Sequence, residues 1–79
     1  MNDTEARVKK VVSQVLGIPV DKIKNTDRFV QDFHAESIQS IELVAGFDAE
    51  FDIEMDEDAA LAVKNIADAI AFVDKLLAK

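Results

Sequence analysis

Ser37 is the residue at which this sequence is best placed to do chemistry. It stands in the stretch HAESIQSIELV, residues 34–44, where a helical pattern begins. Serine is a favoured N-cap, because its hydroxyl accepts a hydrogen bond from a free backbone N–H. A helix start also suits a phosphate ester, since free N–H groups and the helix dipole favour negative charge there. Ser37 is therefore interpreted either as a helix cap or as a modification site.

A hydrolase built on Ser37 has little support. His34 would have to act as the base and Asp32 as the group that orients it, and His34 is the only histidine of the chain. The GxSxG motif that places a nucleophilic serine on a sharp turn is missing. These residues therefore argue against serine hydrolysis, and His34 is interpreted as a solvated loop residue.

Metal and thiol chemistry also find no support in the sequence. The acidic window DAEFDIEMDEDA superficially resembles a calcium loop, but Ile53 stands where the loop needs glycine and Ala59 where it needs a bidentate glutamate. The chain contains no cysteine, which excludes thiolate zinc sites and cysteine nucleophiles. We therefore expect no resident metal.

Length and charge limit the function classes further. The 79 residues suffice for a single domain, residues 1–79, and the net charge of −7 argues against nucleic acid as a partner. No segment approaches the roughly 20 apolar residues of a membrane helix, and the first residues lack an apolar signal region. We therefore expect a cytoplasmic, monomeric protein with no membrane span.

The acidic residues are concentrated in one part of the chain. Between Phe29 and Val63 there is no lysine or arginine, whereas the same interval holds ten aspartates and glutamates. Such a block is either a solvated surface or a means of steering toward basic partner surfaces. Both interpretations remain open from the sequence.

The apolar periodicity predicts an all-α protein. Helices are expected over residues 3–16, 37–51, 56–62 and 66–77, with Asp56 and Asn65 at the starts of the last two and Gly17 ending the first. Residues 17–36 would form an ordered loop with a short helical turn near residues 20–23. The expected core faces and loop anchors are Val8, Val11, Val12, Val15 and Leu16; Ile18, Val20, Ile23, Phe29, Val30 and Phe33; and Ile66, Ala69, Ile70, Val73 and Leu77. The result is a four-helix bundle with a long first loop and a short third helix.

The helix over residues 37–51 carries two apolar stripes. At about 100° per residue, one side gathers Leu43, Val44, Phe47 and Phe51, and nearly the opposite side gathers Ile38, Ile41 and Ala45. A thin bundle cannot bury both sides, so the aromatic side should face the core and the other should stay at least partly exposed. The exposed stripe is either a scatter of surface apolar residues or a docking site.

These residues together resemble the acyl carrier protein family. The stretch DFHAESIQSIELVAGFDAEFDIEM is similar to the family signature, approximately D-L-G-x-D-S-L-D-x-V-E-L-V followed by an acidic helix that ends in E-F. The matching residues are Asp32, Ala35, Ser37, Glu42, Leu43, Val44, Glu50 and Phe51. RVKKVVSQVLG and NIADAIAFV resemble the first and last family helices, so the likeness runs over the whole chain without an obvious gap.

The resemblance implies a carrier and not an enzyme. The fold would be the acyl-carrier-like four-helix bundle, and a phosphopantetheinyl transferase would attach 4′-phosphopantetheine to Ser37 through a phosphodiester. Acyl chains would then be held as thioesters on the thiol of that arm and presented to enzymes of fatty-acid, lipid or polyketide biosynthesis. An aminoacyl or peptidyl carrier, or an unmodified interaction module with the same fold, remains an alternative.

The resemblance also implies roles for further residues. Partner enzymes with basic surfaces would dock on Glu36, Ile38, Ile41, Glu42, Ala45, Asp48 and Asp52. A bound acyl chain would lie among Phe29, Leu43, Phe47, Met55 and Val63, each of which also has an ordinary role in core packing.

The sequence departs from the family pattern around the serine. His34 replaces a glycine, Glu36 an aspartate, Ile38 a leucine and Gln39 an acid. These changes lie beside the attachment position and along the expected docking face. They suggest a specialised carrier with its own set of partners, and they leave open which transferase modifies it.

Overall fold

The computed structural model describes residues 3–78, and for Ser37, Glu57 and Leu61 it describes the backbone alone. Four helices follow one another as α1 (Asp3–Leu16), α2 (Ser37–Phe51), α3 (Glu57–Leu61) and α4 (Ile66–Leu77), with a 3₁₀ turn η1 (Val20–Lys22) in the first loop. Across the described residues, extended pairing is limited to one bridge between Arg28 and Asn65. The predicted all-α fold with a short third helix is confirmed.

The helix boundaries have local causes, which the sequence predicted. Gly17 ends α1 with a φ of 71°, a conformation that glycine adopts without steric cost. The Asn65 Oδ1 accepts a hydrogen bond from the Asp68 N–H at 2.8 Å and caps α4. The Asp56 Oδ1 accepts from the Asp58 N–H at 3.2 Å and caps α3.

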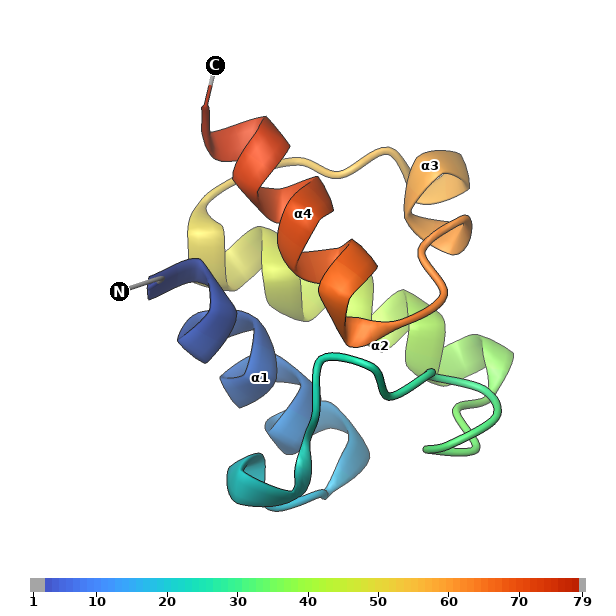
Figure 1. Cartoon of the computed structure of the whole chain (residues 1–79). Coiled ribbons are helices and arrows are strands. Elements are labelled where there is room, and N and C mark those ends of the chain that lie inside the picture. Colours follow the sequence, from blue (N-terminus) through green and yellow to red (C-terminus); the bar gives the residue numbers. More distant parts are fainter. Residues whose placement is uncertain (1–2, 79) are drawn as a thin grey trace.

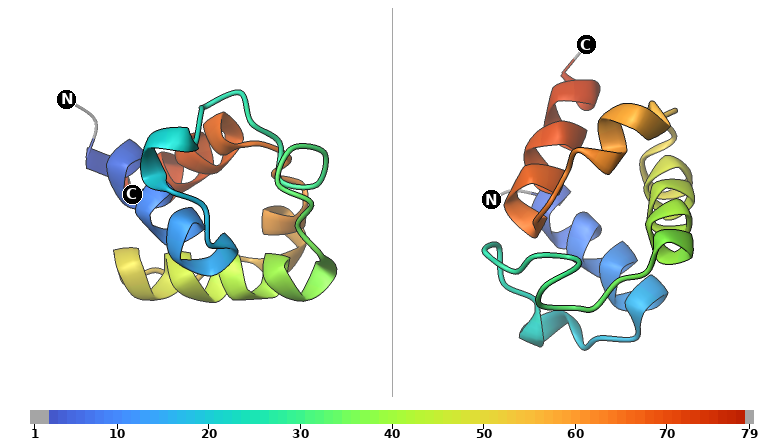
Figure 2. Two further views of the ribbon diagram at one scale, coloured as in Figure 1. Left: turned by 90° about the horizontal axis from the view of Figure 1, so that it is seen from below. Right: turned by 90° about the vertical axis from the view of Figure 1, so that its right-hand side faces the viewer.

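The helices surround one core, in which α1 packs against both α2 and α4 and α3 packs against α2 (Figures 1 and 2). The most deeply buried side chains come from α1 and α4: Val8, Val12, Ile66 and Val73. From α2 the core receives Leu43, Phe47 and Phe51, the aromatic stripe that was expected to face inward.

For three residues the prediction of a core or anchor position is wrong. Leu77 is 43% exposed, because it stands at the last position of α4, a full turn beyond the buried Val73. Val20 and Val30 are 46% and 62% exposed. In a loop, side-chain direction follows the local turns and not a helical period, so apolar character alone does not identify the buried residues.

The long first loop is fixed to the start of α4. The N–H groups of Ile66 and Ala67, the first two of that helix, donate to the carbonyls of Asp27 and Asn25 at 3.0 and 2.9 Å. Helix N–H groups at these positions have no partner within the helix. The loop therefore satisfies them and is itself held in place, which accounts for its order despite its length.

The C-terminal half of α2 lies very close to α1. A Cβ added at Gly46 would come within 2.7 Å of the Val11 Cγ1, a distance that no relaxed contact between carbon atoms has. The absence of a side chain at Gly46 therefore sets the separation of the two helices.

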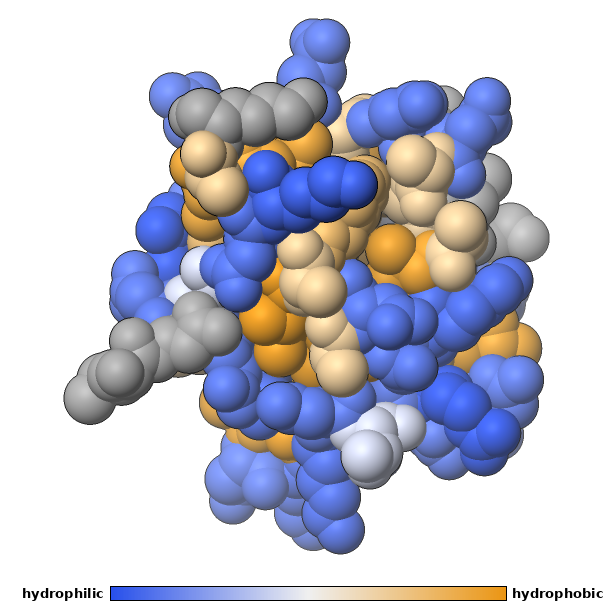
Figure 3. All heavy atoms as spheres, turned by 45° about the horizontal axis from the view of Figure 1, so that its top comes forward, coloured by the Kyte–Doolittle hydropathy of each residue, from blue (hydrophilic) through white to orange (hydrophobic). Residues whose placement is uncertain are grey.

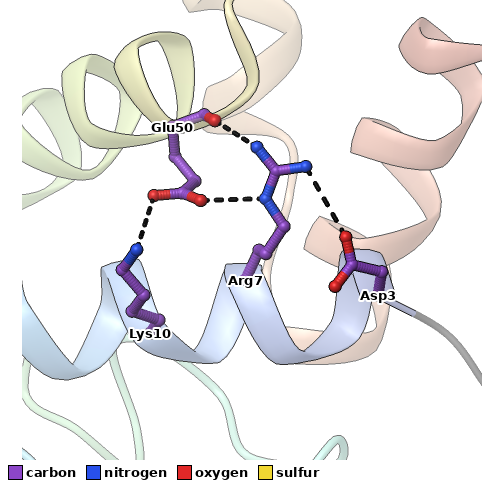
Figure 4. Close-up of polar contacts among 4 residues, drawn as sticks. All are labelled: Asp3, Arg7, Lys10 and Glu50. Carbon is purple, nitrogen blue, oxygen red and sulfur yellow. Dashed lines mark hydrogen bonds and ion pairs between the residues drawn. The ribbon is translucent and has the colours of Figure 1, made fainter.

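Ion pairs join the same two helix segments (Figure 4). The Arg7 Nε donates to the Glu50 Oε2 at 2.8 Å, and the Lys10 Nζ lies 3.1 Å from the Glu50 Oε1. A second N–H of Arg7 donates to the Glu50 carbonyl, and the guanidinium carbon lies 4.5 Å from the centre of the Phe51 ring. The hydrogen bond from Arg7, helped by that from Lys10, holds the pKa of Glu50 below its ordinary value.

Candidate functional site

Ser37 is the first residue of α2, and the N-cap is Glu36. The interpretation of Ser37 as the cap is therefore wrong by one position. The side chain of Ser37 lies outside the part that the structure describes.

The Gln39 Oε1 accepts a hydrogen bond from the Glu36 N–H at 2.8 Å, as in the reciprocal pairing of a capping box. Gln39, which departs from the family pattern, thus has a structural task at the helix start that the sequence analysis missed.

The segment that leads into Ser37 is a tight turn. His34 has a φ of 57°, in the left-handed region that glycine favours and that histidine enters more readily than most residues. Its N–H donates to the Val30 carbonyl at 3.1 Å, and the Ala35 N–H donates to the Phe29 carbonyl at 2.9 Å. The glycine that the family pattern has here therefore corresponds to a backbone requirement, which His34 meets at some steric cost.

Asp32 forms hydrogen bonds with Arg28. Its Oδ2 accepts from the Arg28 N–H at 2.7 Å and from the Arg28 Nε at 3.2 Å. The backbone hydrogen bond of Arg28, followed by that of its side chain, holds the pKa of Asp32 below its ordinary value. The structure therefore gives this carboxylate a role in ordering the loop that carries the turn at His34.

The outer side of α2 carries the exposed apolar stripe that the sequence predicted. Ile38 is 66% exposed and Ile41 60%, and Ala45 is exposed as well. Glu42 is exposed next to them. The predicted exposure of this stripe is confirmed; its use for docking is taken up below.

The acidic residues expected at the docking surface differ in solvent exposure and in hydrogen bonding. Glu36, Glu42 and Asp52 are exposed, and Asp52 ends α2 in the left-handed conformation, with a φ of 54°. Asp48 is half-buried, and its Oδ1 accepts a hydrogen bond from the Met55 N–H at 3.0 Å. Asp48 therefore holds the connection between α2 and α3, a contact that the sequence analysis did not foresee.

A cavity of about 380 Å³ lies between α2, α3, α4 and the long loop. All five residues expected around an acyl chain line it: Phe29, Leu43, Phe47, Met55 and Val63. The cavity is also lined by residues that were not named from the sequence: Val30, Gln31, Ser40, Val44, Ala60, Lys64 and Ala69. Viewed from the side of α3 and α4, the surface shows apolar patches between hydrophilic side chains (Figure 3).

The start of α2 fits a phosphodiester-linked group. Ser37 lies between two exposed residues, Glu36 and Ile38. The first turn of α2 itself holds no acid, but the Glu36 carboxylate directly before Ser37 would oppose the negative charge of a phosphate. The first N–H groups of a helix favour an anion. One turn further along α2, Ser40 already lines the cavity, so an arm attached at the helix start would begin beside the entrance to an apolar space.

A small helical bundle with a serine at the start of one helix and an apolar cavity beside that helix has the features of a carrier domain. Residues 6–73 match the family model described as the phosphopantetheine attachment site. The chain belongs to this PP-binding family and is a phosphopantetheine-carrying carrier protein. Its domain is non-catalytic and requires a transferase that attaches the group and client enzymes that use it. Within residues 3–78, no helix is long and apolar enough to cross a membrane.

Proposed function

We propose that this protein is an acyl carrier whose 4′-phosphopantetheine is attached to Ser37. Ser37 lies within the matched residues 6–73 and is the first residue of α2. When bound, the group supplies a flexible arm whose terminal thiol holds the cargo as a thioester. The chain contributes the attachment hydroxyl, a space for the cargo and a surface that client enzymes recognise.

The cavity is the observation that favours acyl cargo over aminoacyl or peptidyl cargo. Its volume of about 380 Å³ falls in the range of pockets that enclose small ligands. Most of its lining is apolar, with Phe29, Leu43 and Phe47 among the contributors. Each methylene buried there contributes about 0.8 kcal/mol, whereas the ammonium group of an aminoacyl cargo would lose its hydration.

The exposed stripe and the acids beside it support a docking role for the N-terminal half of α2. Ile38 and Ile41 offer apolar contact on the side of the helix that faces away from the core. Glu36 and Glu42 place negative charge beside the stripe, Ala45 extends it, and Asp52 adds charge at the far end of α2. A client with a basic surface would therefore be attracted over a distance set by the ionic strength. Asp48 would contribute its charge, although its carboxylate also holds the Met55 N–H.

Cargo length tests the acyl assignment. The protein would be loaded with hydrolysis-resistant acetyl, butyryl, hexanoyl, octanoyl and palmitoyl pantetheine arms, and with a leucyl arm of similar bulk to hexanoyl. We expect the melting temperature to rise with each added methylene and then to level off once the cavity is full.

A length series without any rise would contradict the acyl assignment. Stabilisation by the leucyl arm equal to that by hexanoyl would favour an aminoacyl or peptidyl carrier instead. The matched variant is Leu43→Ala, which enlarges the cavity. In this variant the melting temperature should level off at a longer acyl chain. The acyl groups found by mass spectrometry on protein isolated from its own cell would identify the natural cargo.

A further inference from the structure

The opening of the cavity is bordered by exposed residues that do not belong to α2. Three of the described residues that line the cavity are also exposed: Val30 and Gln31 in the long loop, and Lys64 just before α4. The lining residues of α2 and α3 are buried or half-buried. Val30 is about as exposed as Ile38 and Ile41 of the stripe. An exposed apolar side chain and an exposed cation therefore stand together where the cavity meets solvent.

Backbone hydrogen bonds fix these two residues relative to the attachment position. The Phe29 N–H donates to the Lys64 carbonyl at 3.1 Å, so Lys64 is joined to the residue before Val30. The Val30 carbonyl accepts from the His34 N–H at 3.1 Å, within the turn that leads into Ser37. Val30 and Lys64 thus belong to the same fixed framework as the start of α2.

The cavity opening and the exposed stripe lie next to each other. Ser40 lines the cavity, and the residue after it, Ile41, belongs to the stripe. A client that takes cargo from an arm on Ser37 has to cover the start of α2, and the cargo leaves the cavity through its opening. A client that does both would also contact Val30 and Lys64.

The charge of Lys64 is opposite in sign to that of the surrounding surface and is not neutralised there. The nearby Arg28 pairs with Asp32 at 3.2 Å, whereas no described carboxylate lies within ion-pair distance of Lys64. From Phe29 to Val63 the chain holds no lysine or arginine. The face that a client would cover therefore has two poles, the acids of α2 and the free ammonium of Lys64.

We propose that Val30 and Lys64 form a second docking contact, which selects client enzymes whose docking face carries both signs of charge. Such a client brings a carboxylate to Lys64 and an apolar side chain to Val30, in addition to the basic patch that faces Glu42. A client turned the other way would bring like charges together, so the two poles fix its orientation over the opening. This inference rests on the proposed docking role of α2 and adds the surface chemistry of the partner.

The sign of the effect of Lys64→Glu tests the proposal. The probe is a client enzyme from the source cell, purified by its ability to remove the octanoyl group from the loaded carrier. We expect Lys64→Glu to lower its kcat/KM about fivefold at low salt and less at high salt, because two carboxylates then face each other. A uniformly basic client would instead react faster with this more acidic variant. Lys22→Glu makes the same charge change at an exposed position that lines no cavity and should not lower kcat/KM.

Two further measurements separate this inference from the docking role of α2. The melting temperature of Lys64→Glu should match that of the wild type, because Lys64 is exposed. Carbodiimide, which couples an ammonium to a carboxylate in contact with it, should link Lys64 to the client. An unchanged or raised kcat/KM in Lys64→Glu, beside a lowered one in Ile41→Ala, would overturn the inference alone. An unchanged kcat/KM in both variants would overturn the docking role of α2 as well.

Discussion

The two halves of α2 are built in opposite ways. The C-terminal half is fixed to α1 by the ion pairs of Glu50 with Arg7 and Lys10 (Figure 4). The close approach at Gly46 and the stacking of Arg7 on Phe51 add to this. The N-terminal half carries exposed apolar side chains on its outer side, and on its inner side it lines the cavity.

This difference shows how one short helix serves stability and function at once. The ion pairs and the close helix contact that join α2 to α1 lie after residue 45, whereas Leu43 anchors the inner side of the first two turns in the core. The first two turns can then offer a docking surface on one side and a cargo space on the other. Changes in the C-terminal half should therefore alter folding, and changes on the outer side of the N-terminal half should alter partner use.

Among the four variants that test this comparison, controls aside, the largest effect is expected from Gly46→Ala. The added Cβ would overlap the Val11 Cγ1, so the free energy of unfolding should fall by about 2 kcal/mol despite the better helix propensity of alanine. Urea denaturation followed by circular dichroism measures the change. Ala45→Ser, on the exposed side one residue earlier, should stay within about 0.5 kcal/mol of the wild type. A Gly46→Ala protein as stable as the wild type would show that the two helices do not lie this close.

The second largest effect is expected from Ile41→Ala. This variant should impair the reaction of the loaded carrier with a client enzyme and leave the stability of the fold unchanged. Ile41 is 60% exposed, so its truncation should change the free energy of unfolding by less than about 0.5 kcal/mol. The kcat/KM of a client enzyme for the loaded carrier should nevertheless fall about tenfold. Leu43→Ala, a buried position two residues on, should instead cost about 3 kcal/mol of stability. A large stability loss in Ile41→Ala would place the stripe on the wrong side of α2.

A smaller effect is expected from the charge reversal Glu42→Lys. Glu42 is exposed beside the stripe, and reversing it should lower the association rate with a client about threefold at low salt and hardly at all at high salt. Stopped-flow measurements over a salt series follow this rate. Asp74→Lys, an exposed reversal on α4, changes the net charge equally and should leave the rate near that of the wild type. If both variants slow association equally, the effect depends on the net charge of the protein and not on the position of Glu42.

The smallest effect is expected from Glu50→Gln in the pH dependence of stability. The folded protein holds the pKa of Glu50 below its unfolded value, so the contribution is present above about pH 4.3 and is lost as the pH falls through the folded pKa. Wild type should therefore lose more stability than Glu50→Gln on acidification. Glu54→Gln, at an exposed position, is the control. Parallel pH profiles of melting temperature for wild type and Glu50→Gln would contradict the role given to the Arg7 hydrogen bond.

The sequence predicted the helices because their signals are local. Apolar residues at helical spacing, the capping residues Asp56 and Asn65, and Gly17 each act within a few positions of the chain. The exposure of Ile38 and Ile41 followed from the same spacing, since two opposite stripes cannot both enter a thin core. The five cavity residues came from the family resemblance, and the structure brings them together around one space.

What the sequence missed depends on contacts between distant segments. The pairing of Arg7 with Glu50 joins residues 43 positions apart, and nothing in either neighbourhood announces it. The presence of Lys64 in the cavity lining follows from the hydrogen bonds between the long loop and the segment that leads into α4. One signal was readable but overlooked: Glu36 and Gln39 have the spacing of a capping box, which would have placed the cap one residue before Ser37.

Intact-mass measurement after incubation with coenzyme A and a phosphopantetheinyl transferase tests the attachment at Ser37 most directly. The wild-type protein should gain the mass of one phosphopantetheinyl group, Ser37→Ala should gain none, and Ser40→Ala, one turn along the same helix, should be modified like the wild type. Modification of Ser37→Ala as readily as of the wild type, or an unmodified wild type beside a control carrier that the same enzyme loads, would contradict the assignment.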